Sequence, residues 1–252
     1  CGTRPPTGCQ LLTFPHNWRF PAVRLCKKHG RESGVSRIFK TTTMGKFILG
    51  DCMDLETGLP SYPDKFFDLA IVDPPYGIGV DGQKKSTSAH GGRREIEFKG
   101  WDNQRPTAAY WKELQRVSKN QIVWGANYFC EFLPPSMGWV FWDKGQRICN
   151  SDGELAFTSF ERALRVAKLN RVHIQYHGGG FHPTQKPVKL YRWLLENYAK
   201  PGQLILDTHV GSASSLIACE SMGFDYVGFE IDPDYYAAAK NRMSKGIQAV
   251  LI

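Results

Sequence analysis

Short apolar runs alternate with longer amphipathic stretches along the chain from about residue 44 to the end. Short runs that stop at turn residues are typical of buried strands, whereas apolar positions that recur about every 3.6 residues predict helices. The pattern predicts strands over 46–49, 66–72, 121–124, 139–142, 155–160, 204–206 and 226–231. It predicts helices over 107–118, 187–199, 214–222 and 233–243, with Thr107 as an N-cap and Pro187 in a first turn. This alternation predicts an α/β fold.

The chain has 252 residues, which is enough for one large domain or two small ones with a sizeable core. Its seven Cys are odd in number and irregularly spaced, which argues against a disulfide framework. No apolar run approaches the roughly 20 residues of a membrane-spanning helix. The start, CGTRPPTGCQ, lacks the apolar segment of a secretory signal. We therefore expect a soluble, cytoplasmic protein that does not contact a membrane.

Residues 1–43 show neither a helical nor a strand period. They hold eight Lys or Arg and one acidic residue, and so carry +7 of the formal net charge of +8. A basic chain usually suggests a nucleic-acid partner, but here the charge belongs to this extension. We interpret 44–252 as the functional domain, beginning at Met44, and 1–43 as a non-essential or disordered extension. The alternatives are a DNA-binding arm, or a zinc site at Cys26 and His29, whose spacing matches no strong ligand pattern.

The apolar run 69–72 ends in Asp73-Pro74-Pro75-Tyr76. An exocyclic amine of a nucleobase is a poor nucleophile because its lone pair is delocalised into the ring. A carboxylate and a nearby carbonyl that accept both amine protons would draw the nitrogen towards a tetrahedral geometry. Two prolines stiffen the turn and leave carbonyls free, and the aromatic ring that follows suits stacking on an extruded base. The plainer interpretation is a strand that ends at two prolines, with Asp73 capping a turn.

Asp-Pro-Pro-Tyr at a strand end resembles the catalytic motif of S-adenosylmethionine-dependent amino methyltransferases, which act on adenine or cytosine. Three further segments of the chain resemble motifs of that family: FHPTQKPV at 181–188, LILDTHVGS at 204–212 and GFEID at 228–232. The catalytic motif comes before the cofactor motif, as in the permuted beta group. The compact phage and prophage DNA adenine methyltransferases resemble the chain more closely, over about 44–243. The segments that carry this likeness are 101–103, 124–129, 141–144 and 154–160.

The resemblance implies a Rossmann-like class I methyltransferase fold, with a mostly parallel sheet and helices on both faces. It implies S-adenosyl-L-methionine as the cofactor and site-specific methyl transfer to the N6 amine of adenine in double-stranded DNA. Asp73 and the Pro74 carbonyl would position the amine, Pro75 would stiffen the turn, and Tyr76 would stack on the flipped base. Positioning would supply much of the rate, and no metal is required.

A Gly-rich turn between a strand and a helix lets the backbone approach a cofactor. A carboxylate at the end of the next strand, here Glu230, suits a bond to ribose hydroxyls. By resemblance, Asp51 contacts the cofactor adenine amine and Lys186 meets the methionine carboxylate, while Asp207 contacts the methionine ammonium or braces the turn. Ordinary strand-end caps are the plainer interpretation of these acids. The expected cofactor-binding residues are Asp51, Lys186, Asp207, His209, Gly211, Ser212, Glu230 and Asp232.

One residue departs from the family pattern, because Ala213 stands where the resemblance predicts glycine. Alanine adds a methyl group and disfavours a positive φ. If the turn requires a positive φ at this position, cofactor affinity should suffer, and if it does not, Ala213 should be nearly silent.

The stretch 77–105 is polar, Gly-rich and long for a loop inside a compact domain, and such loops are usually functional or disordered. We expect it to contact DNA phosphates. Base contacts are expected from this loop and from the strands within 139–160. Core packing explains Tyr128 as well as a place in the target pocket does. The expected DNA-contacting residues are Lys84, Lys85, Arg93, Arg94 and Asn127, while Arg162, Arg165, Lys168 and Arg171 form a second basic run that a solvated face explains equally well.

Three rival functions stay open. An N4-cytosine methyltransferase shares the chemistry, although that group more often has Ser in place of Asp73. An RNA adenine methyltransferase is less consistent with the order of the motifs. A catalytically silent DNA-binding relative is the rival from another class, and the intact motif argues against it. A cognate restriction endonuclease is a candidate partner, and we expect a monomer or a homodimer.

Overall fold

The computed structural model describes residues 44–85, 95–145, 151–170 and 181–250. All of them belong to the compact unit Thr41–Ile252. The extension 1–43, with its candidate zinc ligands, lies outside the described residues, as do Arg93, Arg94 and Arg171.

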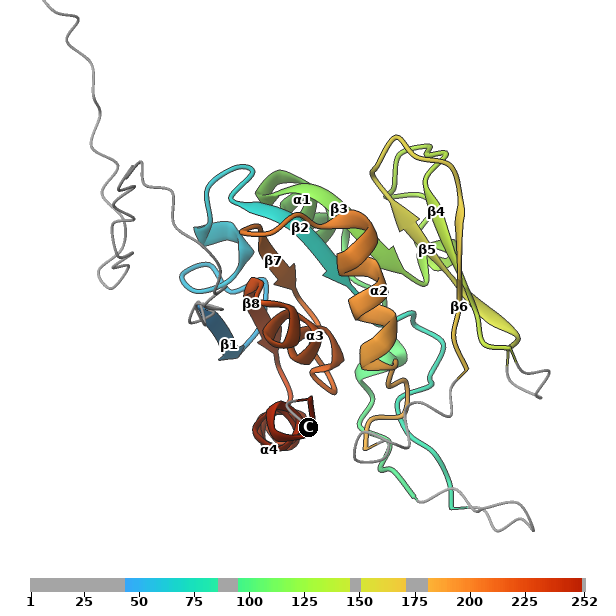
Figure 1. Cartoon of the computed structure of the whole chain (residues 1–252). Helices are drawn as coiled ribbons and strands as arrows, with labels where there is room; N and C mark the ends of the chain where they lie inside the picture. Colours follow the sequence, from blue (N-terminus) through green and yellow to red (C-terminus); the bar gives the residue numbers. More distant parts are fainter. Residues whose placement is uncertain (1–43, 86–94, 146–150, 171–180, 251–252) are drawn as a thin grey trace, which may run out of the picture. The chain divides into compact units, whose positions relative to one another are not determined.

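The described strands form one sheet in the order β1-β8-β7-β2-β3-β5-β4-β6 (Figure 1). Their bounds are Gly45–Leu49 (β1), Phe67–Val72 (β2), Ser118–Trp124 (β3), Trp139–Asp143 (β4), Gly153–Thr158 (β5), Arg165–Lys168 (β6), Leu204–Asp207 (β7) and Asp225–Glu230 (β8). The five strands from β1 to β3 in this order are mutually parallel. β5 pairs antiparallel with β3 and β4, and β6 runs parallel to β4 at the edge. The predicted α/β fold with a mostly parallel sheet is confirmed.

The predicted strands all form, but β6 was not predicted from the sequence. Its four residues lie within the second basic run, where Arg165, Val166 and Lys168 are exposed and only Ala167 is buried. An edge strand that buries one small side chain has no apolar run for sequence analysis to detect. β3 also begins three residues earlier than predicted, because Ser118 and Asn120 continue the parallel pairing with β2.

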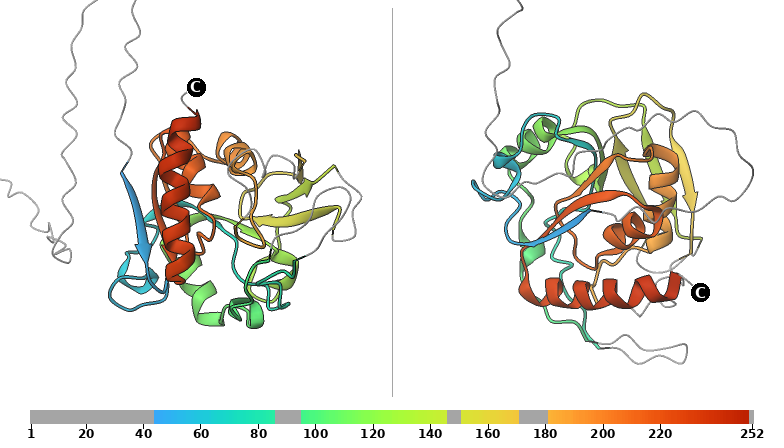
Figure 2. Two further views of the ribbon diagram at one scale, coloured as in Figure 1. Left: turned by 90° about the horizontal axis from the view of Figure 1, so that it is seen from below. Right: turned by 60° about the vertical axis from the view of Figure 1, so that its left-hand side comes forward.

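The four predicted helices form as α1 (Ala108–Val117), α2 (Val188–Tyr198), α3 (Ser214–Met222) and α4 (Pro233–Val250). α2 and α3 pack together over one face of the sheet, and α1 lies on the other face (Figures 1 and 2). Thr107 stands at the N-cap position of α1 in extended conformation, but its side chain makes no capping hydrogen bond. None of the helices in the described ranges is both long and apolar enough to cross a membrane.

The core lies between the central strands and the α2–α3 layer. Trp124 and Trp142 are fully buried beside Leu194, Leu195 and Ile205. Burying one such aliphatic side chain stabilises the fold by about 1.5–3 kcal/mol. This packing holds the strands rigidly, so the residues that follow each strand keep fixed positions at the sheet edge.

Candidate active site

The carboxyl ends of the five parallel strands place the predicted site residues along one edge of the sheet. Asp51 follows β1, Glu230 ends β8, His209 follows β7, Asp73 follows β2 and Asn127 follows β3. Because the lateral order of the strands is β1-β8-β7-β2-β3, Asp73 lies between the predicted cofactor residues on one side and the predicted target residue on the other.

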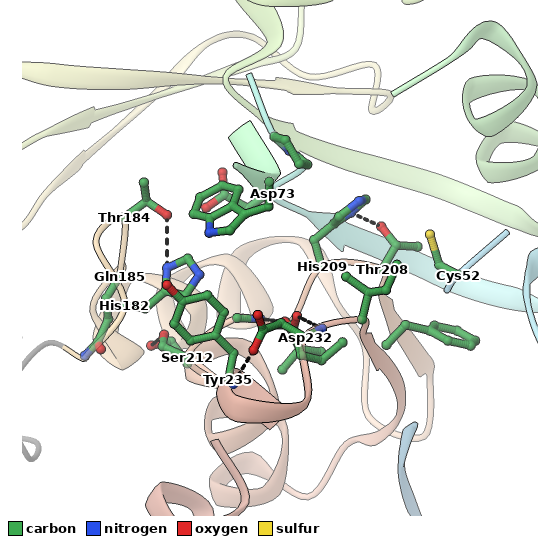
Figure 3. A pocket seen from close by; sticks show the side chains of 18 of the residues that line it. Cys52, Asp73, His182, Thr184, Gln185, Thr208, His209, Ser212, Asp232 and Tyr235 are labelled. Carbon is green, nitrogen blue, oxygen red and sulfur yellow. Dashed lines mark hydrogen bonds between the residues drawn. The ribbon is translucent and has the colours of Figure 1, made fainter. Parts of the chain in front are cut away.

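Two pockets open at this edge and share Asp73 and Lys186. The first, which we call the β7–β8 pocket, is shown in Figure 3. Its lining includes seven of the eight expected cofactor-binding residues: Asp51, Lys186, His209, Gly211, Ser212, Glu230 and Asp232. The second, the β2–β3 pocket, is lined by all four motif residues and by Asn127, Tyr128, Phe141, Trp142, Lys144 and Glu154, among others.

Glu230 ties β8 to the Gly-rich turn. Its Oε2 accepts a hydrogen bond from the Gly211 amide at 2.7 Å, and its Oε1 accepts one from the Asp232 amide at 2.9 Å. A carboxylate offers about four acceptor positions, so two remain for hydroxyl donors in the pocket. Gly211 has a φ of 52°, and a Cβ at this position would lie 3.2 Å from the His182 ring. Only glycine combines this φ with the close approach of His182 without adjustment. The free acceptor positions of Glu230 suit a ligand with a vicinal diol.

Asp207 is the one expected cofactor residue that does not line the pocket. It is buried beneath the turn, where it accepts hydrogen bonds from the His209 amide at 3.0 Å and from the Ser215 hydroxyl. Of its two predicted roles, the structure supports that of a brace for the turn. Burial raises the pKa of Asp207 to about 7.

Aromatic side chains close the other walls of the β7–β8 pocket. Trp101 stacks on His182 with ring centroids 5.3 Å apart, and His182 packs against Tyr235 at 4.5 Å. Thr184 bonds to the His182 ring at 3.2 Å, as Figure 3 shows. Burial lowers the pKa of His182 to about 3, so this ring is neutral and suits packing against an uncharged aromatic ligand.

The residues of the Asp73-Pro-Pro-Tyr motif contact one another. The Tyr76 hydroxyl donates a hydrogen bond to Asp73 Oδ1 at 2.7 Å. The Tyr76 ring stacks on Tyr128 with a centroid distance of 5.0 Å and an interplanar angle of 16°. Tyr128 is 36% exposed, so its interpretation as a core residue is wrong. The predicted stacking of Tyr76 on a base stays a prediction, because Tyr128 covers one face of its ring in this structure.

The described part of the stretch 77–105 is not a free loop. The buried Asp102 carboxylate accepts backbone hydrogen bonds from Tyr76, Gly77 and Val80 at 2.7–2.9 Å. Lys99 pairs with Asp232 at 2.7 Å. These contacts fasten the segment to the motif and to the β7–β8 pocket, so only part of it is available for DNA. Lys84 and Lys85 are exposed and so remain candidates for phosphate contacts.

A set of buried charges that the sequence did not reveal surrounds Asp73. Lys186 Nζ lies 2.5 Å from Asp73 Oδ2 and 3.1 Å from Glu154 Oε2, and Lys144 Nζ lies 2.8 Å from Glu154 Oε1. Burial raises the pKa of Asp73, and the charge of Lys186 opposes this shift. Burial opposes ionisation of Glu154 as well, but the two lysines bring its pKa down to about 2. Lys186 was predicted to meet the cofactor carboxylate, and in this structure it is paired with Asp73.

Ala213 adopts the left-handed conformation, with φ 60° and ψ 23°. The turn thus takes the positive φ for which glycine was expected. The methyl group is fully buried in the core and does not line the β7–β8 pocket. The condition set for a loss of cofactor affinity is thus met, but the methyl group lies in the core, so we expect strain in the turn and little effect on a bound molecule.

Within the described ranges, no group of His, Cys, Asp and Glu is arranged to hold a metal ion. The described cysteines, Cys52, Cys130 and Cys219, are all free thiols. Burial raises the pKa of Cys52, which lines the β7–β8 pocket, to about 12, so it is not a reactive thiolate.

Comparison with known proteins agrees with this geometry. Residues 121–241 match the family model for N6/N4 amino methyltransferases, described as DNA methylase. This match and the relatives together support a DNA amino methyltransferase. The chain is 26% identical to the protein named "Putative methylase YubD" of Escherichia coli (strain K12), over 80% of this chain and 91% of that protein.

Two solved structures share the fold. The M1.HpyAVI complex with S-adenosylmethionine superposes with a TM-score of 0.52 at 15% identity, over 79% of this chain and 99% of that chain. The PvuII DNA methyltransferase, which is cytosine-N4-specific, superposes with a TM-score of 0.53 at 15% identity, over 83% and 92%. At this identity the likeness concerns the fold alone.

Proposed function

We propose that this protein transfers the methyl group of S-adenosyl-L-methionine to the N6 amine of an adenine at a specific site in double-stranded DNA. The observation that carries the proposal is the position of Asp73 and Pro74. Asp73 lies where the β7–β8 and β2–β3 pockets meet, and Pro74 lines the β2–β3 pocket. Among the described residues, none donates a hydrogen bond to the Pro74 carbonyl. A carboxylate and a free carbonyl side by side suit an amine with two protons.

The β7–β8 pocket would hold the cofactor, which supplies an electrophilic methyl group on its sulfonium sulfur when bound. The two acceptor positions left on Glu230 suit the ribose hydroxyls, and Asp51 at the far end suits the adenine amine. The fold shared with the M1.HpyAVI complex with S-adenosylmethionine supports this assignment.

The residues of the chain would position the acceptor amine. Asp73 and the Pro74 carbonyl would each accept a hydrogen bond from one amine N–H, so the nitrogen lone pair is drawn out of the ring and directed towards the β7–β8 pocket. The new N–C bond would form as the sulfonium C–S bond breaks, and the nitrogen would then release one proton. Asp73 must be ionised for this role, because its oxygens already accept from Tyr76 and from Lys186 and still have to accept from the amine. Lys186 favours that form. Asn127, Lys84 and Lys85 are the proposed contacts to the target nucleotide and the phosphates.

Aspartate at position 73 favours adenine over cytosine by resemblance. The second candidate is N4-cytosine methylation, which the fold shared with the cytosine-N4-specific PvuII enzyme favours. The two reactions need the same donor set, and the fit of one ring or the other to the β2–β3 pocket decides between them.

The test is incubation of purified protein with S-adenosylmethionine and unmethylated DNA, followed by nucleoside mass spectrometry. We expect N6-methyladenine, and none with Asp73→Ala. N4-methylcytosine would replace the adenine proposal with its alternative. Cofactor binding without methyl transfer to DNA, but with transfer to RNA, would refute the DNA substrate. If the cofactor does not bind at all, the protein is a silent relative.

A further inference from the structure

Four alternating charges, two of them buried and two partly buried, form a continuous chain beside the motif. It runs from Asp73 through Lys186 and Glu154 to Lys144, and each contact is between 2.5 and 3.1 Å. The two lysine side chains are 3% and 5% exposed, whereas Glu154 is 26% exposed on the side of the β2–β3 pocket. Three separate segments contribute: the end of β2, the approach to α2 and the β4–β5 hairpin.

Glu154 is the central member of this chain because each of its carboxylate oxygens binds a different lysine. Oε2 accepts from Lys186 and Oε1 from Lys144. Indole rings lie beside both ammonium groups, Trp124 at 5.4 Å from Lys186 Nζ and Trp142 at 5.2 Å from Lys144 Nζ. Cation–π contacts of this kind offset part of the cost of burying a charge. Both lysines are therefore held in place, and neither is a flexible surface group.

The hairpin geometry explains how Glu154 reaches Lys186. In the antiparallel pairing of β4 with β5, Glu154 is opposite Trp142, and the Lys144 amide donates to the Asp152 carbonyl at 3.0 Å. This register brings Lys144 and Glu154 to the same side of the hairpin, facing the end of β2. A shift of one residue would turn Glu154 to the opposite face of the sheet.

We propose that Glu154 is a positioning residue for methyl transfer: it fixes the Lys186 ammonium against Asp73, and Lys144 balances its charge. The inference rests on the proposed function, because it concerns the same carboxylate. A lysine side chain has several rotatable bonds and loses about 2 kcal/mol of conformational entropy when it is fixed. Without Glu154, Asp73 would be the only ion-pair partner of Lys186 among the described residues, and the 3.4 Å contact to the Tyr76 hydroxyl belongs to the same motif, so the ammonium could move with that carboxylate. A second anchor on a rigid hairpin fixes the orientation of Asp73 towards the amine.

Glu154 acts through Lys186, and the other groups around Asp73 do not replace it. Tyr76 binds the second oxygen of Asp73, while Tyr191 and Asp207 interact with it electrostatically. None of these groups supplies a positive charge, so Lys186 is the cation in contact with Asp73 among the described residues, and Glu154 is its other anionic partner.

The experiment compares wild type with Glu154→Gln and with the matched control Glu113→Gln. Glu113 is also ion-paired and partly buried, but it lies on α1 with Arg116 and lines neither pocket. The single-turnover rate constant for methyl transfer is measured, together with the steady-state KM values for S-adenosylmethionine and for DNA. For Glu154→Gln we expect a rate at least 10-fold lower with both KM values within about 3-fold, because a misplaced catalytic carboxylate affects the chemical step. Glu113→Gln should behave as wild type.

The double variant Lys144→Met with Glu154→Gln separates positioning from simple charge balance. It removes the cation that Glu154→Gln leaves unpaired, so it keeps the fold intact even where the single variant is unstable. We expect it to remain at least 10-fold slower than wild type, because Lys186 still lacks its anchor. Recovery of the wild-type rate in the double variant would overturn the inference. A large rise in the KM for DNA at an unchanged rate would also overturn it, because Glu154 would then be a base contact. A wild-type protein that transfers no methyl group would refute the proposed function and this inference together.

Discussion

The substitution Gly125→Ala tests whether the Tyr76 ring must keep its position for catalysis. Gly125 follows β3 and has a φ of 64°. A Cβ at this residue would lie 2.1 Å from Tyr76 Cε1 and 2.3 Å from Tyr76 Cζ. Separations below about 3 Å do not occur for real Cβ atoms, so the ring has to move. Tyr128 covers one face of that ring, so the movement must break the hydrogen bond from Tyr76 to Asp73.

Two effects add in this variant. The left-handed backbone costs alanine about 1–2 kcal/mol, and the lost hydrogen bond to a carboxylate costs about 1.5–3 kcal/mol. The smaller entropy of the unfolded chain returns about 0.4–1 kcal/mol. The expected loss is about 2–4 kcal/mol of unfolding free energy, or a Tm lower by roughly 4–16 °C for a protein of this size. The methyl transfer rate should fall at least 10-fold, because Asp73 loses a hydrogen bond that orients it.

Gly202→Ala is the matched control. Gly202 has a φ of 83°, lies in the turn before β7, and has no atom within 4 Å of an added Cβ. It should lose only about 0.5–1.5 kcal/mol in stability and keep full activity. Thermal unfolding and single-turnover kinetics measure both quantities. A Gly125→Ala enzyme that stays as fast as wild type, or a Gly202→Ala enzyme that slows equally, would show that Tyr76 placement does not limit the reaction.

Three further substitutions test other parts of the site. Asp102→Ala leaves three backbone amides without their acceptor and should lower the unfolding free energy by about 1–3 kcal/mol, measured by urea denaturation, with a lower methyl transfer rate. Asp207→Asn tests the pH dependence of stability. Burial raises the pKa of Asp207 from 3.8 to about 7. The wild-type protein therefore loses unfolding free energy from this group as the pH rises from about 4 to 7. The variant should therefore gain stability relative to wild type at pH 8 compared with pH 5, and a constant difference would contradict the shift. Ala213→Gly releases about 1–2 kcal/mol of backbone strain but loses a buried methyl group worth about 0.8 kcal/mol, so stability should change by about 1 kcal/mol or less. Calorimetric affinity for S-adenosylmethionine should stay within 2-fold, since the methyl group does not line the pocket.

Sequence reasoning located the strands and their ends well, because both depend on local signals. Apolar runs predict buried strands, and the carboxyl ends of parallel strands share one edge. That rule is sufficient to bring Asp51, Glu230, His209 and Asp73 together from positions far apart in the chain. The assignment of Asp73 depended in addition on a motif that is rare by composition.

Glu154 and Lys144 were not predicted because their role depends on tertiary contacts alone. They belong to an antiparallel hairpin, so the strand-end rule does not apply to them. Glu154 was visible as a charge beside the apolar run 155–157, and a charge in that position is a signal for a buried ion pair. Its partner Lys186 is distant in sequence, and Lys186 had been assigned to the cofactor. The pairing of Tyr76 with Tyr128 was hidden for the same reason, since it needs the turn at Gly125.

The position of β2 in the sheet explains why the motif follows this strand and no other. β2 pairs with β7 on one side and with β3 on the other. The β7 side carries the Gly-rich turn, and the β3 side carries Asn127 and the hairpin with Glu154. A carboxylate at the end of β8 would face only the first pocket, and one at the end of β3 would face only the second. Only the end of β2 borders both, so under the proposed function an amine held there would reach a methyl group held on the opposite side.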